Sequence, residues 1–352
     1  MKRVFLKLSV IIIAIIIVFT ILVILISHKK DPDYIMDFIN KNPEKTSLVV
    51  KKNGKLTYSH NSYKQMNVAS LFKIIIAIEL VNQVKDKEVN INEKVNIKDI
   101  DHFNKVPKAN SSYKKWRKEQ VKNKKYVTIY EVTRGMIRYS SNPNTDYLID
   151  FLGEKNINKT AKKLSNNKHE KIHYINSELA IPLYLKEKYN LSNKEVENKL
   201  INLSPKEYEK VRKEVENELY SNSSSKYLKN KNNFYPTEEE QKIWSYKTPK
   251  STSIAYANIL DNIDRYYESN KYNKLLENIL TIKNDSSFSE KGKSGYTINI
   301  NTKAVTTNKN KDKMTIVFLS NDLDNYEKQT IQKNIDYFIE GILSGKYRFE
   351  RK

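Results

Sequence analysis

Residues 70–84 are apolar on almost every side of a helix, and this stretch constrains the fold more than any other. Its large aliphatic side chains point in all directions and do not form one stripe: Ile74, Ile75, Ile76, Ile78, Leu80 and Val81. A helix without a polar face must be surrounded by other elements, so it belongs in the middle of a domain. A chain of 352 residues is long enough to bury one large core or two modest ones around it.

Alternating patterns typical of β-strands stand near both ends of the chain. Residues 47–52 and 55–59 flank Asn53-Gly54, which predicts a hairpin with a type I′ turn. Three more alternating runs cover residues 292–300, 304–307 and 314–320. Helical patterns fill the chain between and after them, at 127–138, 144–152, 157–164, 254–260, 272–282 and 331–343. We therefore predict an α+β fold, in which an antiparallel sheet formed by both chain ends is flanked by helices and joined to an all-helical part.

Three segments are expected to lie outside this plan. Residues 31–45 are polar with two prolines and predict a tether before a main domain at 46–352. Residues 100–125 are basic and irregular, so we expect a surface loop. Residues 183–247 are charged and amphipathic, with capping boxes that begin at Ser192 and Ser204, and they predict a helical insertion.

The N-terminus predicts a membrane anchor at residues 1–30. Residues 8–27 carry no charge, and this length suits a membrane-spanning helix better than a cleaved signal. Lys2, Arg3 and Lys7 favour an inside N-terminus, although Lys29 and Lys30 weaken that bias. A cleaved secretory signal is the alternative. Both interpretations place the main domain outside the cell, and a chain without cysteine has no disulfides there.

The chain is strongly basic, with 63 Lys and Arg against 41 Asp and Glu and a net charge of +22. The basic residues are spread along the whole chain and form no dense stripe of the kind that indicates nucleic-acid binding. Abundant Lys, Asn, Ile and Tyr indicate the compositional bias of an AT-rich genome. An electrostatic attraction to anionic cell-wall polymers or a membrane surface is the second interpretation.

The helix at 70–84 begins with Ser70-Leu71-Phe72-Lys73. Lys73 follows Ser70 by one turn and lies on the same face. A lysine in the first turn opposes the helix dipole and is partly desolvated, and both effects favour its neutral form. A neutral amine close to a hydroxyl can accept its proton and activate it as a nucleophile. By itself the pattern is weak, because Ser-x-x-Lys recurs at Ser27/Lys30, Ser111/Lys114, Ser112/Lys115, Ser165/Lys168 and Ser223/Lys226.

Two further motifs give the first one its meaning. Ser140-Ser141-Asn142 follows a helical segment and precedes Pro143, so its hydroxyl and amide occupy a tight connection where they can relay a proton or hold a substrate amide. Lys293-Ser294-Gly295 offers a cation and a hydroxyl for a substrate carboxylate, and the glycine allows close approach to the strand. The backbone N–H of Tyr296 can pair with that of Ser70 as an oxyanion hole.

In this order the three motifs resemble those of the serine β-lactamase and penicillin-binding protein superfamily, and the layout is most similar to class A β-lactamases. The resemblance implies that Ser70 is acylated, that Lys73 is the base and that Ser140 shuttles a proton. Asn142, Lys293, Ser294, Gly295 and Tyr296 would then bind a β-lactam or a D-Ala-D-Ala-like peptide. It implies no cofactor and no metal, and the five histidines match no ligand spacing: His28, His60, His102, His169 and His173.

The sequence leaves open which residue is the base that activates water to release the acyl group. Class A enzymes carry a Glu, two variable residues, then Leu-Asn, and the best match is Glu178-Leu179-Ala180-Ile181-Pro182, with proline in place of the asparagine. Glu178 could equally be a surface-loop residue. Three functions therefore remain: a membrane-anchored extracellular hydrolase of β-lactams, a D,D-peptidase or transpeptidase acting on wall peptides, and a non-catalytic protein that binds wall peptide or antibiotic.

Overall fold

The computed structural model of the chain describes residues 31, 33–220, 226–284, 289–309 and 312–347. The predicted anchor, residues 1–30, lies outside these ranges. Within them, no helix has both the length and the apolar character needed to cross a bilayer.

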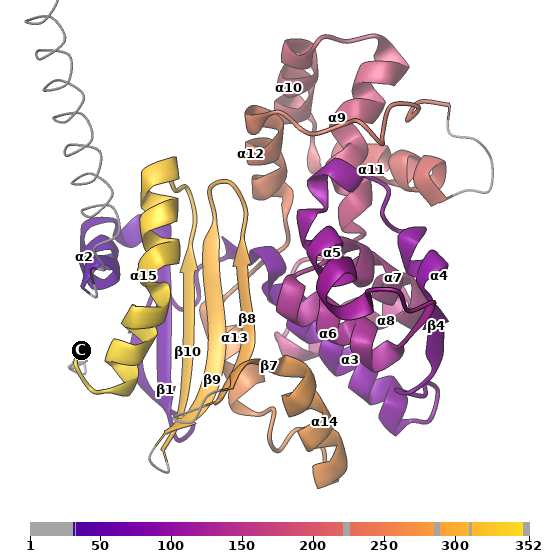
Figure 1. The fold of residues 1–352 in the computed structure, drawn as a ribbon. Coiled ribbons are helices and arrows are strands. Elements are labelled where there is room, and N and C mark those ends of the chain that lie inside the picture. The colour runs from indigo at the N-terminus through magenta and orange to yellow at the C-terminus, as the bar shows by residue number, and fades with distance from the viewer. Residues whose placement is uncertain (1–30, 32, 221–225, 285–288, 310–311, 348–352) are drawn as a thin grey trace, which may run out of the picture.

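A six-stranded antiparallel sheet forms one side of the molecule, with strand order β2-β1-β10-β9-β8-β7 (Figure 1). Its strands are β1 (Thr46–Lys52), β2 (Lys55–His60), β7 (Thr281–Asn284), β8 (Ser289–Tyr296), β9 (Asn301–Lys309) and β10 (Asp312–Ser320). Asn53 and Gly54 both have positive φ, as the predicted type I′ turn requires. The sheet therefore joins both ends of the described chain, as predicted. The helix expected to run to residue 282 ends at Leu280, and β7 takes up its last residues.

Helices cover the outer face of the sheet. These are α2 (Tyr34–Lys41) and α15 (Asn325–Leu343), and a short 3₁₀ turn, Pro43–Lys45, connects α2 to β1. Ile35, Phe38 and Ile39 of α2 are buried in the same cluster as Phe338 of α15. The prediction of a tether at residues 31–45 is wrong, because two turns of amphipathic helix there complete the core on this face.

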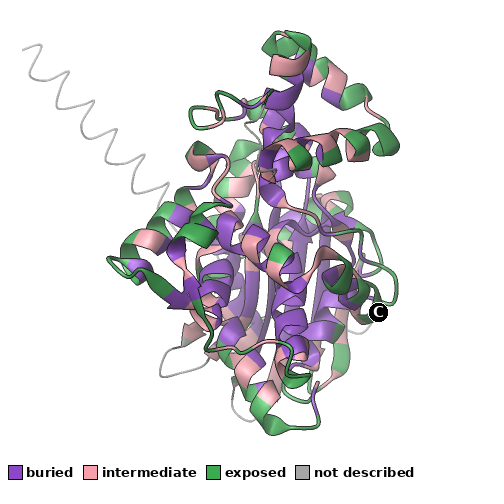
Figure 2. Cartoon of the chain, turned by 90° about the vertical axis from the view of Figure 1, so that its right-hand side faces the viewer, coloured by how far each residue is buried: buried purple, intermediate pink, exposed green. Residues whose placement is uncertain are grey.

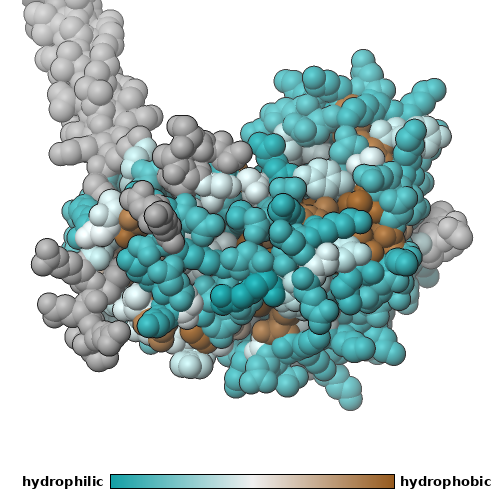
Figure 3. Space-filling model, turned by 90° about the horizontal axis from the view of Figure 1, so that it is seen from below, coloured by the Kyte–Doolittle hydropathy of each residue, from teal (hydrophilic) through white to brown (hydrophobic). Residues whose placement is uncertain are grey.

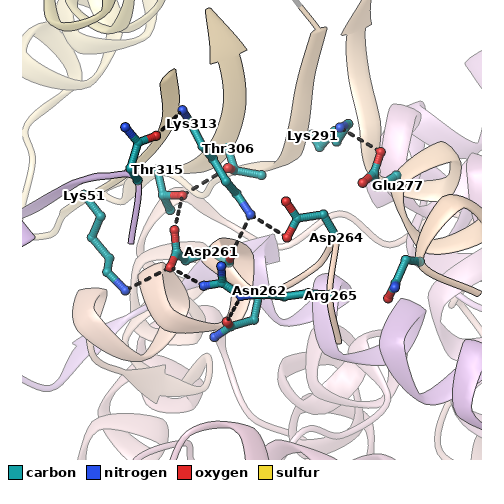
Figure 4. A network of polar contacts seen from close by, with 12 residues as sticks. Lys51, Asp261, Asn262, Asp264, Arg265, Glu277, Lys291, Thr306, Lys313 and Thr315 are labelled. Carbon is teal, nitrogen blue, oxygen red and sulfur yellow. Dashed lines mark hydrogen bonds and ion pairs between the residues drawn. The ribbon is translucent and has the colours of Figure 1, made fainter. Parts of the chain in front are cut away.

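Helix α13 (Ser253–Asp261) lies on the other face of the sheet, where a polar network fixes its end. Asp261 is buried and accepts hydrogen bonds from Lys51 on β1, at 3.3 Å, and from Arg265, at 3.2 Å. Lys313 on β10 donates to the backbone carbonyl of Asp261 and to Asp264, at 2.7 Å (Figure 4). Lys51 and Lys313 together tie the end of this helix to two strands, and the buried carboxylate of Asp261 is paired.

The all-helical part surrounds α3 (Lys73–Lys85), which follows a 3₁₀ turn, η2 (Ala69–Phe72). Residues 74–78 of α3 are at most 1% exposed, as expected for a central helix. Its neighbours are α6 (Ile129–Tyr139), α7 (Asn142–Leu152), α8 (Glu154–Leu164) and α14 (Asn270–Leu280). Buried residues fill the contacts among these helices, and exposed residues lie on the outer faces (Figure 2).

Residues 100–125 do not form the expected surface loop. They contain the end of α4 (Ile97–Asp101), a 3₁₀ turn at Pro107–Ala109, α5 (Ser111–Trp116) and a π-helical turn at Arg117–Val121, and the short strands β4 (Lys94–Asn96) and β5 (Tyr126–Thr128) flank them. Trp116 is 1% exposed, and a Cβ on Gly135 of α6 would lie 2.7 Å from its indole nitrogen. The prediction was wrong because the lysines that dominate the pattern face outward, while the tryptophan fills the space above a glycine.

The stretch expected as a helical insertion, residues 183–247, is largely helical. It comprises the C-terminal part of α9 (Ile175–Tyr189), from residue 183 on, and all of α10 (Asn193–Asn202), α11 (Pro205–Tyr220) and α12 (Glu238–Lys247). Capping boxes begin α10 at Ser192 and α12 at Thr237. Because α10, α11 and α12 all pack against α9, whatever α9 carries is held by this segment.

The face of the molecule that is seen from below is mostly hydrophilic (Figure 3). Seen from below, hydrophobic residues appear as small patches among hydrophilic ones (Figure 3). Tyr63, Tyr126, Tyr296 and Tyr326 are among the large exposed side chains, and each keeps a hydroxyl for water.

Candidate active site

Ser70 lies in the seam between the sheet and the all-helical part. The preceding strand β3 (Met66–Asn67) pairs with β6 (Lys250–Ser251), and the amide of Val68 donates to the carbonyl of Pro249 at 3.0 Å. Ala69 then has φ of +44°, a left-handed conformation that costs a non-glycine residue about 1 kcal/mol. These constraints fix the turn that presents the hydroxyl of Ser70.

The first two motifs meet in one hydrogen-bonded chain. The Ser140 and Ser70 hydroxyl oxygens are 2.9 Å apart. Lys73 Nζ lies 3.2 Å from the Ser140 hydroxyl, 2.8 Å from the Ser140 carbonyl and 3.3 Å from Asn142 Oδ1. Ser140 ends α6 in the left-handed region, with φ of +57°, and this turn points it back toward Ser70. Lys73 is thus linked to Ser70 through Ser140.

Lys73 is completely buried, and its surroundings favour the neutral amine. Burial and the nearby charge of Lys293 hold the pKa of Lys73 well below its ordinary value, against the opposing effect of Asp146. A neutral amine has two N–H groups and one lone pair. The Ser140 carbonyl and the Asn142 amide oxygen can accept the two protons, which leaves the lone pair for the Ser140 hydroxyl. Ser70, Ser140 and Lys73 can therefore pass a proton in sequence.

The third motif lies on β8 against the turn that carries Ser70. A Cβ on Gly295 would lie 2.5 Å from the Ser70 amide nitrogen and 2.8 Å from Thr302 Oγ1, so only glycine fits. Lys293 is 4% exposed, and burial lowers its pKa to about 7. Its ammonium donates to the backbone carbonyl of Ser294. All three motifs therefore converge, although the pairing of the Tyr296 and Ser70 amides as an oxyanion hole stays a prediction.

Glu178 is neither in a loop nor at the surface. It lies in the first turn of α9 and is 8% exposed, so the surface-loop interpretation is wrong. Burial raises the pKa of Glu178 to about 7, while nearby His173 and Arg212 and a hydrogen bond from Trp244 act in the other direction. A carboxylate with this pKa changes charge near neutral pH.

A cleft of about 550 Å³ lies along the seam. Ser70, Ser140, Asn142, Glu178 and Tyr296 line it. Tyr235, Trp244 and Ile298 add an apolar wall, so the cleft combines a few polar groups with hydrophobic surface, as small-molecule sites commonly do.

A chain of buried amides behind the site was not found from the sequence. Asn142 Nδ2 donates to Asn110 at 3.4 Å, Asn110 donates to Asn176 at 2.8 Å, and Asn176 donates to Asp146 at 2.7 Å. Asp146 is fully buried and also accepts the backbone N–H groups of Ile175 and Asn176, at 2.7 and 2.9 Å. It therefore caps α9 and fixes the start of the helix that carries Glu178.

His173 was assigned no role from the sequence, yet it lines the same cleft. Its two ring nitrogens face Glu154 and, at 3.7 Å, Glu209. Arg212, which is 2% exposed, also binds Glu209. No pattern of spacing marks these residues, because they come from a loop and from two helices that are far apart in the sequence, α8 and α11.

Residues 32–234 match the profile of the Beta-lactamase enzyme family. The chain belongs to this family. The match includes residues 183–234, most of the stretch expected to be an insertion. No curated protein matches the chain.

Solved structures show the same fold at low identity. A β-lactamase from Sphaerobacter thermophilus is 12% identical, covers 90% of this chain and 99% of its own, and superposes with a TM-score of 0.57. A β-lactamase from Francisella tularensis is 15% identical with the same coverage and a TM-score of 0.54. A class A β-lactamase from Mycobacterium abscessus is 12% identical, covers 89% and 99%, and has a TM-score of 0.53.

Replacing Lys293 should reveal what its burial costs. In the folded protein its pKa is about 7 against an ordinary 10.5, so between these values the unfolded chain binds a proton that the folded chain does not. Stability therefore rises with pH across this window and is lowest below pH 7. We expect Lys293→Met to stabilise the protein by roughly 2–4 kcal/mol at pH 8, measured by urea unfolding.

The gain should grow toward pH 6 and shrink toward pH 10. Lys291→Met is the matched control, because Lys291 stands on the same strand but pairs with Glu277 at 2.8 Å (Figure 4). It should give no gain. A Lys293→Met protein that is less stable than the unmodified chain at pH 7 would contradict this account of the site.

Proposed function

We propose that the chain is a serine hydrolase that β-lactams acylate on Ser70 and that hydrolyses them. The observation that carries the proposal is the hydrogen-bonded series of Ser70, Ser140 and buried Lys73 at the edge of a cleft. Membership of the Beta-lactamase enzyme family supports it.

The geometry of these residues supports one route to acylation. The Ser70 oxygen attacks the lactam carbonyl and its proton passes to the Ser140 oxygen, while the Ser140 proton passes to Lys73 Nζ. A new C–O bond forms and the lactam C–N bond breaks. The nitrogen then takes a proton back from Ser140, which Lys73 reprotonates. Proton transfer by positioned groups is worth about 10²–10⁴ in rate.

Recognition uses the remaining motif residues. Lys293 and Ser294 bind the substrate carboxylate, and Asn142 holds the side-chain amide of the substrate. The backbone N–H groups of Ser70 and Tyr296 stabilise the developing oxyanion. The approach of Gly295 to the Ser70 amide supports this arrangement, since it holds the strand close to the nucleophile.

Deacylation needs a base for water, and we assign this role to Glu178. It takes a proton from a water molecule, and the water oxygen forms a new C–O bond with the ester carbonyl carbon. The ester C–O bond to Ser70 then breaks, and the proton that Glu178 accepted passes to the Ser70 oxygen. Loss of such a base costs about 10²–10⁴ in rate, or roughly 3–5.5 kcal/mol. Burial of Glu178 at the cleft supports the assignment.

A D,D-peptidase or transpeptidase acting on wall peptides is the second candidate. One observation favours it: with a pKa of about 7, Glu178 is partly protonated at neutral pH and is then no base. An acyl-enzyme that water clears slowly suits a peptidase that β-lactams inhibit. A protein that only binds wall peptide or antibiotic would form no covalent adduct.

We also propose that residues 8–27 anchor the chain in the cell membrane, with the domain outside. The uncharged stretch and the basic residues before it support this proposal, and the charge of +22 supports attraction to anionic wall polymers. A membrane-impermeant fluorescent penicillin should label the protein on intact cells. Labelling that requires cell lysis would contradict the outside location.

Adduct formation and decay test the function. The full chain should gain the mass of one penicillin, followed by intact mass spectrometry after a single addition. Ser70→Ala should form no adduct, because the acylated oxygen is gone. The matched control is Ser112→Ala, since Ser112 also lines the cleft and also precedes a lysine by three residues; it should still form the adduct.

The lifetime of the adduct separates the candidates. A β-lactamase clears it within the reaction, and Glu178→Gln should then acylate normally but hold the adduct about 10²–10⁴ times longer. The decay in the unmodified chain should quicken as pH rises through 7, where Glu178 ionises. A long-lived adduct without any substitution points to the peptidase, and no adduct at all contradicts both enzymes.

A further inference from the structure

Glu178 has a direct hydrogen-bond donor on a helix far away in the sequence. Trp244 Nε1, on α12, donates to Glu178 Oε2 at 3.2 Å. An indole has a single N–H and can only donate, so the oxygen it contacts is best an ionised carboxylate oxygen. Both side chains line the cleft that holds Ser70.

The position of Trp244 is itself well defined. The capping box of Thr237 and Glu240 starts α12, and Thr248 at its end accepts a hydrogen bond from Asn67, just before the turn that carries Ser70. Helix α12 also packs against α9. The indole is therefore held between the nucleophile's strand and the helix of Glu178.

Charged groups face Glu178 from the other elements packed around it. His173 precedes α9, and Arg212 on α11 pairs with Glu209 and Glu216. Asp146 of α7 lies beneath the start of α9, and the half-buried ring of Tyr208 on α11 is also close. His173 and Arg212 favour the ionised carboxylate, Asp146 disfavours it, and burial disfavours it most.

We infer that Trp244 is a positioning residue for Glu178, so that α12 is a working part of the active site. The inference rests on the proposed role of Glu178 as the deacylation base. The indole N–H holds Oε2 and leaves Oε1 to accept the proton of a water molecule. It also stabilises the ionised form of the Glu178 carboxylate, because a hydrogen bond to a charged group is stronger than one to a neutral group.

Trp244→Phe tests this, since it keeps an aromatic ring in the cleft wall and removes only the N–H. Deacylation of the penicillin adduct at pH 7 should slow by about tenfold or more, while the acylation rate stays within about twofold. The pH midpoint of deacylation should move upward, because the ionised carboxylate has lost a donor. Trp116→Phe is the matched control: it removes the other tryptophan, which is buried outside the cleft, and should leave that midpoint in place.

A spectroscopic readout is independent of turnover. In Trp116→Phe the single remaining tryptophan is Trp244, and its fluorescence should titrate with a midpoint near pH 7 as Glu178 ionises. Adding Glu178→Gln should abolish that titration.

The outcomes separate the two claims. If the unmodified chain never deacylates but the fluorescence titrates as expected, the proposed β-lactamase function fails while the coupling of Trp244 to the charge of Glu178 stands. If the pH titration of the Trp244 fluorescence is the same with and without Glu178→Gln, the inference is overturned, whatever the rate of turnover. An unmoved deacylation midpoint in Trp244→Phe, or an equal slowing of acylation and deacylation, also overturns it, because the indole would then have only a packing role.

Discussion

The burial of an amine next to a hydroxyl is the constraint on which the rest of this structure depends. Lys73 has no exposed surface, and the buried Lys293 lies close enough to disfavour its charge. Removing two lysine amines from water opposes folding, because the unfolded chain keeps both as hydrated cations, so the surrounding core must be large enough to offset this cost. The apolar helix that begins at Lys73 and the helices around it provide that core. A basic nitrogen is thereby kept available to Ser70 through Ser140.

Much of the fold could be predicted, because periodicity reports which faces are buried. The Asn53-Gly54 hairpin, the central helix and the antiparallel sheet of both chain ends all follow from local patterns. Where the pattern is weak, the prediction failed. Trp116 is buried, although the lysines around it in the sequence point outward. The stretch of residues 31–45 is short and polar, so its sequence does not show that one helical face, at Ile35, completes the core. Such contacts depend on partners distant in the sequence.

Some features of the site could also be predicted from the sequence, and others could not. The convergence of Ser70, Ser140 and Lys293 was predictable, because their three motifs occur along the chain in the order that is typical of one family. Asp146, which fixes the start of α9, lies in an ordinary helical pattern, and nothing local distinguishes it. The burial of Glu178 was equally hidden, since it depends on α10, α11 and α12 packing against α9. These features arise from tertiary packing. The sequence could therefore predict the nucleophile, but not the role of Asp146 or the burial of Glu178.

The charge of Lys73 is the most direct test of this account. Lysine side chains labelled with ¹³C and ¹⁵N can be titrated by NMR in the folded protein, and the Lys73 signal can be assigned by its loss in Lys73→Met. We predict that the Lys73 amine titrates well below its ordinary pKa of 10.5. A Lys73 signal that remains an ammonium at pH 8 and titrates near 10.5 or above would contradict the central claim.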